Sequence, residues 1–512
     1  MRRAPLLVAL AALAGLALLV ACAPDYLASR GYPLDDSWIH AVYGRALAHT
    51  GSLQYNPGIS ATGSTAPLWS GLLAAPHLLG RSLGTIVLLT KLLGFALHLA
   101  AAVVLYFALG SASESSLLRA IGAGLVACDP DLVAAAVSGM EIPLAALAAC
   151  SVLLAARHGG FLAYAAVCTI APWARPEVGV LCFAIPVGLF LRRDHQRLRT
   201  TLAAAVCGSA VSFGLLALRN FAVSGRPLPA TFYAKVGQGS ASLLADQWLG
   251  FSQVLDHLAI VDSSVLLALL GLVATAVLVL KDGDDDVAAA AAFASALLFF
   301  AVSFVLVPPV DPEAFYHQRY VLPAVPLLVG AVPQLAERLI KSWLRPAHRP
   351  SARLAVLALL VASVLVGSTT RYPRLANDAR NIDDVQVAIG RVLADAPAAD
   401  VIWVTDAGAI RYFGNAFVVD LVGLNTPEVR GPSAQAYLDA HPPRYIEIVP
   451  GWLSLDKASS ENVEAQHFTP STPYTVTSFM PMSSQWLARC PPALVSGQIS
   501  VGAGTFHFAC AP

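Results

Sequence analysis

The sequence predicts an α-helical polytopic membrane protein with about 11 transmembrane helices, followed by a C-terminal extracytoplasmic α/β domain. Two observations support this fold class. Of the 512 residues, 57% are hydrophobic and only 12% are charged, whereas soluble domains are about 25% charged. Apolar runs of about span length also recur along residues 1–370 and then cease. The 32 basic and 32 acidic residues cancel, so no basic excess favours a nucleic-acid partner.

The first predicted span is the apolar run 4–23, which follows Met1-Arg2-Arg3. A cleaved signal peptide and a lipoprotein signal ending at Cys22 are the alternatives, but the many later runs favour an uncleaved span. The stretch 66–80 is shorter than the roughly 20 residues that a span needs, so we expect it to lie along the membrane surface. The remaining runs lie at 83–108, 119–137, 141–157, 161–173, 178–191, 200–222, 259–280, 287–307, 320–340 and 354–369.

Basic residues set the predicted orientation. With the N-terminus inside, the inner segments hold about twice as many Lys and Arg residues as the outer segments, in agreement with the positive-inside rule. Eleven spans then place the C-terminus outside. In an alternative topology 66–80 crosses and 161–191 is one span, but Arg175 and Glu177 would then lie in mid-membrane. We prefer two short helices that meet at this charged pair and border a cavity.

The tail, residues 371–512, lacks an apolar run of span length. Residues 385–393 have helical periodicity, while 401–404 and 416–419 are short apolar runs typical of buried strands. We therefore predict a membrane module over 1–370 and an α/β domain over 371–512. Outer compartments permit disulfides, so the two cysteines of the tail are predicted to pair, with two free thiols as the alternative; they are Cys490 and Cys510.

Polar residues collect at the outer ends of the predicted spans. Asp35 and Asp36 stand in the first outer loop, residues 24–82. Adjacent carboxylates raise each other's pKa, and one of them can act as a general base toward a hydroxyl; a helix N-cap is the structural alternative. The same face of the membrane is predicted to hold Glu141, Arg175, Glu177, Lys235, His317 and Arg319.

The basic members of this group can hold a phosphate. Lys235 offers a point charge, and Arg319 offers a bidentate fork. Interfacial snorkelling is the alternative for Lys235, and an ion pair with Asp311 or Glu313 is the alternative for Arg319. The sequence contains no P-loop, no glycine-rich dinucleotide motif and no CxxC or HExxH metal motif.

Several short motifs occur in an order that resembles a known family. They are Asp35-Asp36, Tyr43-Gly44-Arg45, Tyr55-Asn56-Pro57-Gly58, the segment Gly63 to Trp69, Ser138-Gly139-Met140-Glu141, Ala174-Arg175-Pro176-Glu177, Leu228 to Lys235, His317-Gln318-Arg319-Tyr320, Asp406 to Ile410 and Asp420 to Leu424. The set resembles GT-C fold glycosyltransferases, which are polytopic enzymes that use polyprenyl-phosphate sugars. It is nearest in pattern to bacterial arabinofuranosyltransferase-type members.

The resemblance implies an enzyme of the bacterial cytoplasmic (inner) membrane that moves a sugar from a polyprenyl-phosphate donor to an envelope glycan or lipid acceptor. Asp35 or Asp36 matches the essential acid of the first outer loop, and Glu141 stands where a second acid is expected, with Asp129 and Asp131 as nearby alternatives. A divalent cation at Asp35 or Asp36 stays open. A transporter or flippase of lipid-linked sugars is the alternative function.

The remaining site residues receive two implied roles. The donor phosphate would be held by Lys235, His317, Arg319 and Arg175. The cavity for the substrates would be lined by Glu177, Trp69 and Tyr233.

Overall fold

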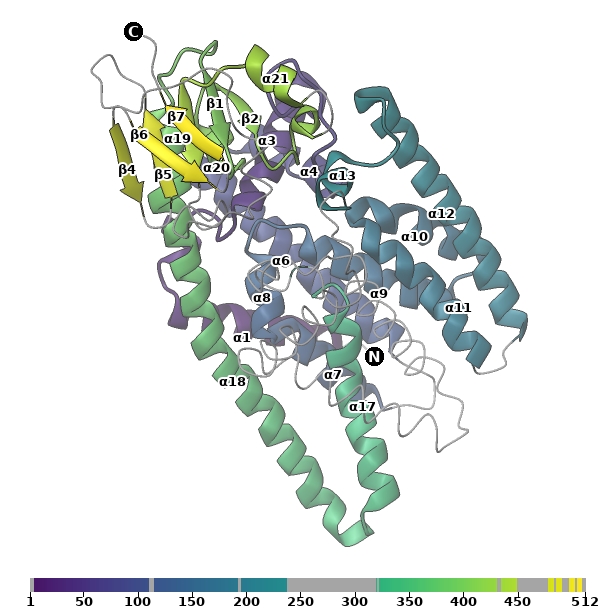
Figure 1. Ribbon diagram of the computed structural model, residues 1–512. Helices are drawn as coiled ribbons and strands as arrows, with labels where there is room; N and C mark the ends of the chain where they lie inside the picture. Colours follow the sequence, from purple (N-terminus) through teal and green to yellow (C-terminus); the bar gives the residue numbers. More distant parts are fainter. Residues whose placement is uncertain are drawn as a thin grey trace.

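The computed structural model describes residues 4–109, 115–191, 195–236, 319, 322–430, 434–448, 478–482, 485–489, 497–501 and 504–508. This part of the chain forms a bundle of long helices with a small β-sheet at one end (Figure 1). The predicted spans at 259–280 and 287–307 lie outside the described residues. The same holds for His317 and for the predicted Cys490–Cys510 disulfide.

Long helices account for most of the described chain. They are α1 (Ala4–Cys22), α3 (Asp35–Thr50), α6 (Leu83–Ala108), α7 (Ser116–Cys128), α9 (Ile142–His158), α10 (Phe161–Ala174), α12 (His195–Ser224), α17 (Val325–Trp343) and α18 (Arg349–Ile382). Shorter helical segments connect them. These are α2 (Tyr26–Ser29), α4 (Pro67–Leu72), α5 (Ala74–Leu79), α8 (Pro130–Ala136), η1 (Pro176–Val180), α11 (Leu181–Leu191), α13 (Ala230–Val236) and η3 (Pro346–His348).

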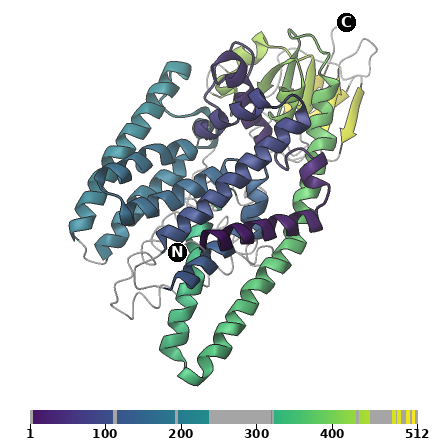
Figure 2. The same cartoon turned by 180° about the vertical axis from the view of Figure 1, so that it is seen from behind.

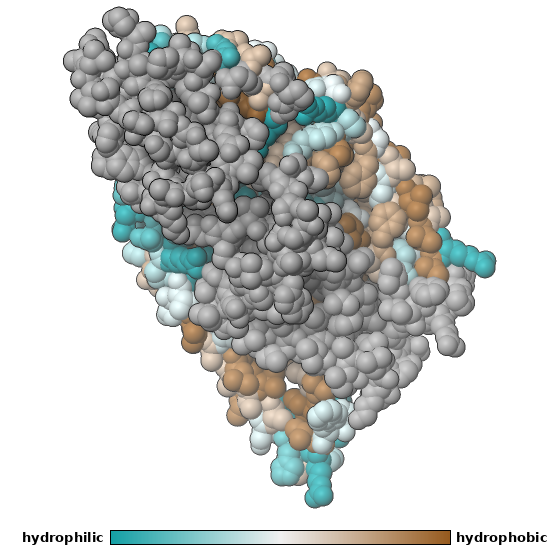
Figure 3. Space-filling model, in the orientation of Figure 1, coloured by the Kyte–Doolittle hydropathy of each residue, from teal (hydrophilic) through white to brown (hydrophobic). Residues whose placement is uncertain are grey.

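The surface of the bundle is apolar where a membrane would surround it. Among the described residues, four helical segments are long and apolar enough to cross a membrane: Ala4–Cys22, Leu83–Ala108, Arg197–Ser224 and Pro346–Val392. Figure 3 shows apolar surface over α12 and over the α17–α18 hairpin, whose tip is hydrophilic. Water disfavours so large an exposed apolar area, whereas hydrocarbon accommodates helices whose backbone groups are paired internally. The chain therefore belongs in a membrane.

One predicted span, over 119–137, is divided into α7 and α8. The break lies at Asp129, whose Oδ1 accepts the N–H groups of Asp131 and Leu132 at 3.1 and 3.0 Å. Asp129 is therefore the N-cap of α8, and Pro130 occupies the first turn, where a missing N–H costs nothing. The expectation of one continuous helix over these residues is wrong.

Two other segments are each divided into shorter helices. The stretch 66–80 forms α4 and α5, each of six residues, and neither is long enough to cross a membrane. The region 161–191 forms two helices, α10 and α11, which are separated by Arg175 and the turn η1. A single span through 161–191 is therefore not formed.

Helix α18 joins the bundle to the sheet. The predicted boundary between residues 370 and 371 falls inside this helix. Arg371 Nε of α18 pairs with Asp131 Oδ1 of α8 at 3.0 Å in a buried position. Helix α1 also reaches α18 (Figure 2), and the Tyr372 hydroxyl donates to the Gly15 carbonyl of α1 at 3.3 Å. The helical stretch continues through the π-turn η4 (Asp383–Val387) and α19 (Ala388–Val392), which confirms the predicted helical periodicity of 385–393.

The sheet has the strand order β2-β1-β3-β5-β4, with a separate hairpin of β6 and β7. Strand β1 runs parallel to β2 and β3, and β5 runs antiparallel to β3 and β4. The strand predicted at 401–404 is confirmed, and the one predicted at 416–419 begins one residue later. The strands are β1 (Val401–Val404), β2 (Phe417–Asp420), β3 (Tyr445–Ile448), β4 (Ser478–Met482), β5 (Gln485–Arg489), β6 (Gly497–Val501) and β7 (Gly504–Phe508).

Helix α3 of the first outer loop shares a hydrophobic core with the tail. Its contact is with the short helix α20 (Ala409–Phe413), which connects β1 and β2. The Trp38 ring is 1% exposed, and its centroid lies 4.8 Å from that of Tyr412 and 4.9 Å from that of Phe413. Aromatic pairs at such distances add to the stabilisation from burial alone. The first outer loop and the tail are therefore packed as one unit (Figure 1).

The loop after α3 also completes the hydrogen bonding of the sheet edge. Strand β2 is an edge strand, and such strands present unpaired backbone groups. Asn56 Nδ2 donates to the Val418 carbonyl at 2.8 Å, and Asn56 Oδ1 accepts the Val418 N–H at 3.1 Å. The adjacent Tyr55 hydroxyl donates to the Ala407 carbonyl at 2.6 Å.

Replacement of Asn56 tests this joint. Asn56→Leu removes both partners of Val418, and each buried backbone group left unpaired costs about 1–3 kcal/mol. We expect a clearly lower melting temperature for the variant purified in detergent micelles. Asn377→Leu, at an exposed position of α18, is the control and should melt like the wild type. Equal melting temperatures for both variants would contradict the proposed edge pairing.

Candidate active site

Asp36 and Arg319 form an ion pair next to the joint between α3 and the tail. Asp36 stands in the first turn of α3, and its Oδ2 lies 2.6 Å from Nη1 of Arg319. The Asp36 side chain is 38% exposed and that of Arg319 is 16% exposed. The sequence predicted both residues in the site but in separate roles. Their pairing leaves a carboxylate within reach of a substrate and beside a fixed positive charge.

Arg175 supports this pair from the interior. Its Nη1 lies 2.6 Å from Glu141 Oε1 and donates to the backbone carbonyl of Arg319 at 3.2 Å. Nε and Nη2 each donate to Glu177 at 3.3 Å. Arg175 is 3% exposed and Glu141 is 1% exposed, and a buried pair needs such additional hydrogen bonds to offset its desolvation. The guanidinium thus orders the backbone that carries Arg319.

His40 continues this network and is not among the site residues predicted from the sequence. Its Nε2 lies 3.2 Å from Glu141 Oε2, and its Nδ1 shares a hydrogen bond of 2.9 Å with Ser70 Oγ. Ser70 Oγ in turn lies 2.8 Å from Ser64 Oγ. His40 follows Asp36 by four residues on α3, and residues at this spacing lie on one helix face. That spacing is the signal that could have identified it.

Asp35, the neighbour of Asp36, faces the tail. Its Oδ2 accepts the N–H of Gly408 at 2.6 Å, and its Oδ1 accepts the N–H of Ala409 at 2.7 Å. Asp35 therefore caps the N-terminus of α20 across the joint, while the N-cap of its own helix is Leu34. A Cβ on Gly408 would overlap the backbone of Asp35, so this approach requires glycine.

Asp35, which is partly buried, lies beside two buried acids at the joint, Asp406 and Glu447. Burial raises the pKa of Asp35 well above its usual range, and the charge of Asp406 raises it further, while the two backbone donors of α20 oppose the shift. Burial and Asp406 also raise the pKa of Glu447 on β3. The Glu447 carboxylate accepts the backbone N–H groups of Thr405 and Asp406 at 2.8 and 3.1 Å. The Glu447 carboxylate thus joins β3 to the residues after β1, and the Asp35 carboxylate joins α3 to the start of α20.

A tight turn before α9 places Glu141. Gly139 in this turn has a φ of +82°, and a Cβ there would lie 2.6 Å from the Tyr32 ring, so the turn requires glycine. Trp69 is fully buried, and its Nε1 donates to the Gly139 carbonyl at 2.9 Å. The predicted cavity residue Trp69 therefore supports the turn that carries Glu141.

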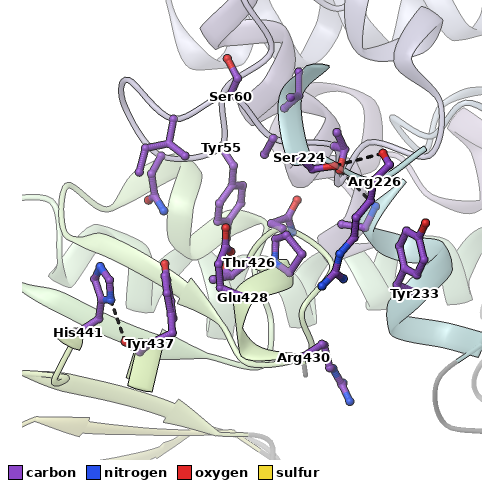
Figure 4. A pocket seen from close by; sticks show the side chains of 18 of the residues that line it. Tyr55, Ser60, Ser224, Arg226, Tyr233, Thr426, Glu428, Arg430, Tyr437 and His441 are labelled. Carbon is purple, nitrogen blue, oxygen red and sulfur yellow. Dashed lines mark hydrogen bonds between the residues drawn. The ribbon is translucent and has the colours of Figure 1, made fainter. Parts of the chain in front are cut away.

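A cavity of about 380 Å³ lies between the first outer loop, the α12–α13 connection and the tail (Figure 4). Small-molecule sites commonly measure about 300–1,000 Å³. Tyr233, predicted to border a cavity, lines it, whereas Asp36 and Arg319 do not. The cavity is therefore separate from the Asp36–Arg319 pair.

Two predicted phosphate ligands are not placed by the structure. Lys235 lies in α13, but its side chain is not among the described ones, and His317 lies outside the described residues. Within the described ranges, no group of three or more His, Cys, Asp or Glu side chains converges to hold a metal ion. The positive partner that the structure shows at Asp36 is the guanidinium of Arg319.

Comparisons with known proteins show the fold of this chain. ArnT from Cupriavidus metallidurans in the apo state matches with a TM-score of 0.52 and 15% identity, over 94% of this chain and 97% of that chain. ArnT bound to undecaprenyl phosphate matches with a TM-score of 0.51 and 14% identity, over 95% and 99%. The archaeal oligosaccharyltransferase AglB from Archaeoglobus fulgidus, in complex with an inhibitory peptide and a dolichol-phosphate, matches with a TM-score of 0.56 and 11% identity, over 86% and 68%.

The sequence comparisons add little about function. A family described as "Domain of unknown function (DUF8728)" matches residues 380–490, which include α20 and all strands of the sheet β2-β1-β3-β5-β4. No curated protein matches the chain. At the identities above, the solved structures establish the fold alone. The chain shares the fold of these solved structures, so the predicted GT-C-like fold is confirmed at that level, whereas the arabinofuranosyltransferase-type pattern is not.

The buried acids predict how the stability of the joint depends on pH. Asp35 and Glu447 have raised pKa values in the folded protein, so the folded state binds more protons than the unfolded state. Their contribution to the free energy of unfolding is therefore full below the unfolded pKa values of about 4 and is lost as the pH rises through the folded values. Asp406→Asn removes a neighbouring charge and should weaken this dependence.

Thermal melting of the purified protein between about pH 5 and pH 8 measures the effect. The wild type should lose more stability toward pH 8 than Asp406→Asn does. Asp395→Asn, an exposed residue of the tail, is the matched control and should follow the wild type. If Asp406→Asn lost more stability toward pH 8 than the wild type, the charge of Asp406 would not be a cause of the pH dependence.

Proposed function

We propose that this chain is a membrane glycosyltransferase that moves a sugar from a polyprenyl-phosphate donor to an envelope glycan or lipid acceptor. The observation that supports this most directly is the partly exposed Asp36 carboxylate beside Arg319 in a protein of GT-C fold. Solved proteins of this fold hold lipid phosphates: undecaprenyl phosphate on ArnT and dolichol-phosphate on AglB. A sugar linked to a lipid phosphate is therefore the class of donor that we propose here.

The proposed topology follows from the charge distribution of the sequence. We place the chain in a bacterial cytoplasmic membrane with the N-terminus inside, about 11 spans, and the tail on the outer face. The packing of α3 on α20 supports a shared compartment for the first outer loop and the tail. The Asp36–Arg319 pair adjoins this joint, so the reaction would take place at the outer face.

The reaction begins with the hydroxyl of the acceptor. Asp36 accepts the hydroxyl proton as the acceptor oxygen attacks the anomeric carbon of the donor sugar. The bond between that carbon and the phosphate oxygen breaks, and the polyprenyl phosphate leaves with the bonding electron pair. Arg319 stabilises the negative charge that develops on the leaving phosphate. Lys235 and His317 are proposed to assist Arg319, on the basis of their sequence positions.

The other acids and Arg175 are proposed to position this pair. Glu141 is buried against Arg175 and His40, so it acts through Arg175 on the backbone of Arg319. Asp35 has both oxygens bound to backbone donors of α20, so we assign the proton transfer to Asp36. Glu177 holds the outer side of the Arg175 guanidinium.

Two substitutions distinguish the proposed catalytic role of Asp36 from the structural role of Asp35. Asp36→Asn should lower kcat by about 10²–10⁴-fold, the usual contribution of a general base, without lowering the melting temperature. Asp35→Asn should lower the melting temperature first, because an amide provides one acceptor where two backbone donors must be bound. The assay measures sugar transfer from polyprenyl-phosphate donors in proteoliposomes, beginning with polyprenyl-phosphate arabinofuranose.

Asp395→Asn serves as the matched control in this assay and should transfer at the wild-type rate. Full transfer by Asp36→Asn, together with loss of transfer at unchanged stability in Asp35→Asn, would reverse the assignment. Movement of the lipid-linked sugar across the bilayer without transfer would instead identify a transporter or flippase.

A further inference from the structure

One wall of the 380 Å³ cavity is a stack of three aromatic rings from the tail. The centroids of Phe417 and His441 lie 5.5 Å apart at an interplanar angle of 15°, and those of Tyr437 and His441 lie 4.2 Å apart at 27°. His441 Nδ1 also lies 2.8 Å from the Tyr437 carbonyl, which fixes the order of the stack. Tyr437 belongs to the short helix α21 (Ala434–Ala440). The three rings therefore form one aromatic wall of the cavity.

The opposite wall carries guanidinium groups. Arg226 lies over the Tyr233 ring at 5.3 Å from its centroid, and Arg430 donates from Nε and Nη2 to the Val422 carbonyl at 2.9 and 2.7 Å. Figure 4 shows Arg226 and Tyr233 across the cavity from Tyr437 and His441. The Arg430 guanidinium is thus held in place before any ligand binds, whereas Arg226 is exposed and lies over the Tyr233 ring.

Polar groups lie between the two walls. Figure 4 shows Tyr55, Thr426 and Glu428 in the middle of the cavity. A carboxylate accepts hydrogen bonds from hydroxyls, and a guanidinium donates to them. The Glu428 carboxylate disfavours an anionic ligand, and Arg430 already uses two of its nitrogens on a carbonyl. The cavity, with two guanidinium groups and one carboxylate, therefore suits a ligand that has many hydroxyls and little negative charge.

A sugar ring has both properties that this cavity selects. One face of the ring presents C–H groups, which the negative face of an aromatic ring attracts, and its edge presents hydroxyls to Glu428 and Arg226. We propose that the cavity is a binding subsite for a neutral saccharide unit of the acceptor glycan, separate from Asp36. This inference rests on the proposed function and identifies the acceptor as a glycan. It also gives the tail a part in acceptor recognition.

The subsite is formed by three segments that meet only in the folded chain. The loop after α3 provides Tyr55, the α12–α13 connection provides Arg226, and the tail provides Glu428 and Tyr437. The docking of the tail on α3 sets the position of this cavity relative to Asp36. A saccharide held here would be presented to the reaction centre in a constant orientation, and this reduces the entropic cost of the transfer step.

Binding of defined oligosaccharides to the full-length protein in detergent micelles tests the subsite. The probes are neutral hexasaccharides of arabinose, galactose or mannose residues, and their dissociation constants are measured by thermophoresis. At least one should bind the wild type, and Tyr437→Ala and Glu428→Gln should each raise its Kd by about tenfold or more, as expected for the loss of one well-placed contact. Asp439→Asn, at an exposed position of α21 outside the cavity, is the control and should change the Kd less than twofold.

The Asp36→Asn variant separates this inference from the proposed function. It should bind the hexasaccharide like the wild type while sugar transfer is lost. Binding that shows the expected variant pattern, in a protein that transfers no sugar from any polyprenyl-phosphate donor, would support the saccharide site and contradict the glycosyltransferase. Failure of the wild type to bind any hexasaccharide, unchanged Kd values in both cavity variants, or tighter binding of a phosphorylated hexasaccharide would overturn the subsite.

Discussion

Helix α3 is held on one side by the tail, and the position of the candidate active site depends on that contact. Trp38 packs against Tyr412 and Phe413, and the Asp35 carboxylate binds the first two N–H groups of α20. The apolar part of the contact provides most of the free energy, since it removes large rings from water. The polar part provides direction, because a carboxylate that binds two backbone donors allows one orientation of the helix end. The first turn of α3, with Asp36, is thereby fixed.

On its other side, the site depends on two buried charges, Glu141 and Arg175, that pair with each other at 2.6 Å. Glu141 and Arg175 are almost fully buried, and their desolvation is costly unless each remaining polar atom is bound. Glu177 and the carbonyl of Arg319 accept hydrogen bonds from Arg175, and His40 Nε2 lies 3.2 Å from Glu141 Oε2. The result is a preorganised guanidinium at Arg319, next to a carboxylate that stays open to solvent. Preorganised charge of this kind stabilises a developing anion without the reorganisation that water would require.

The sequence predicted those features that depend on local pattern. Apolar runs identified most helices, and the short continuous apolar run at 401–404 identified β1, because hydrophobic patterning is a property of neighbouring residues. The break at Asp129 was also visible locally, since an Asp-Pro pair is a helix-start signal, but the apolar run concealed it. The partner of Asp35 was not predictable in this way. It lies more than 370 residues away in the sequence, and only the packing of α3 on α20 brings it near.

The adjacent acids show why a motif can serve two purposes at once. Consecutive residues on an α-helix point about 100° apart, so Asp35 and Asp36 cannot both face the same partner. The structure directs Asp35 to the backbone of α20 and Asp36 to Arg319 of the membrane module. Because both belong to the same helical turn, a rotation or shift of the tail against α3 would displace Asp36 by a similar amount. The carboxylate–guanidinium geometry at Arg319 therefore depends on the docked tail, and the Asp-Asp pair couples the docking of the tail to the geometry of the candidate active site.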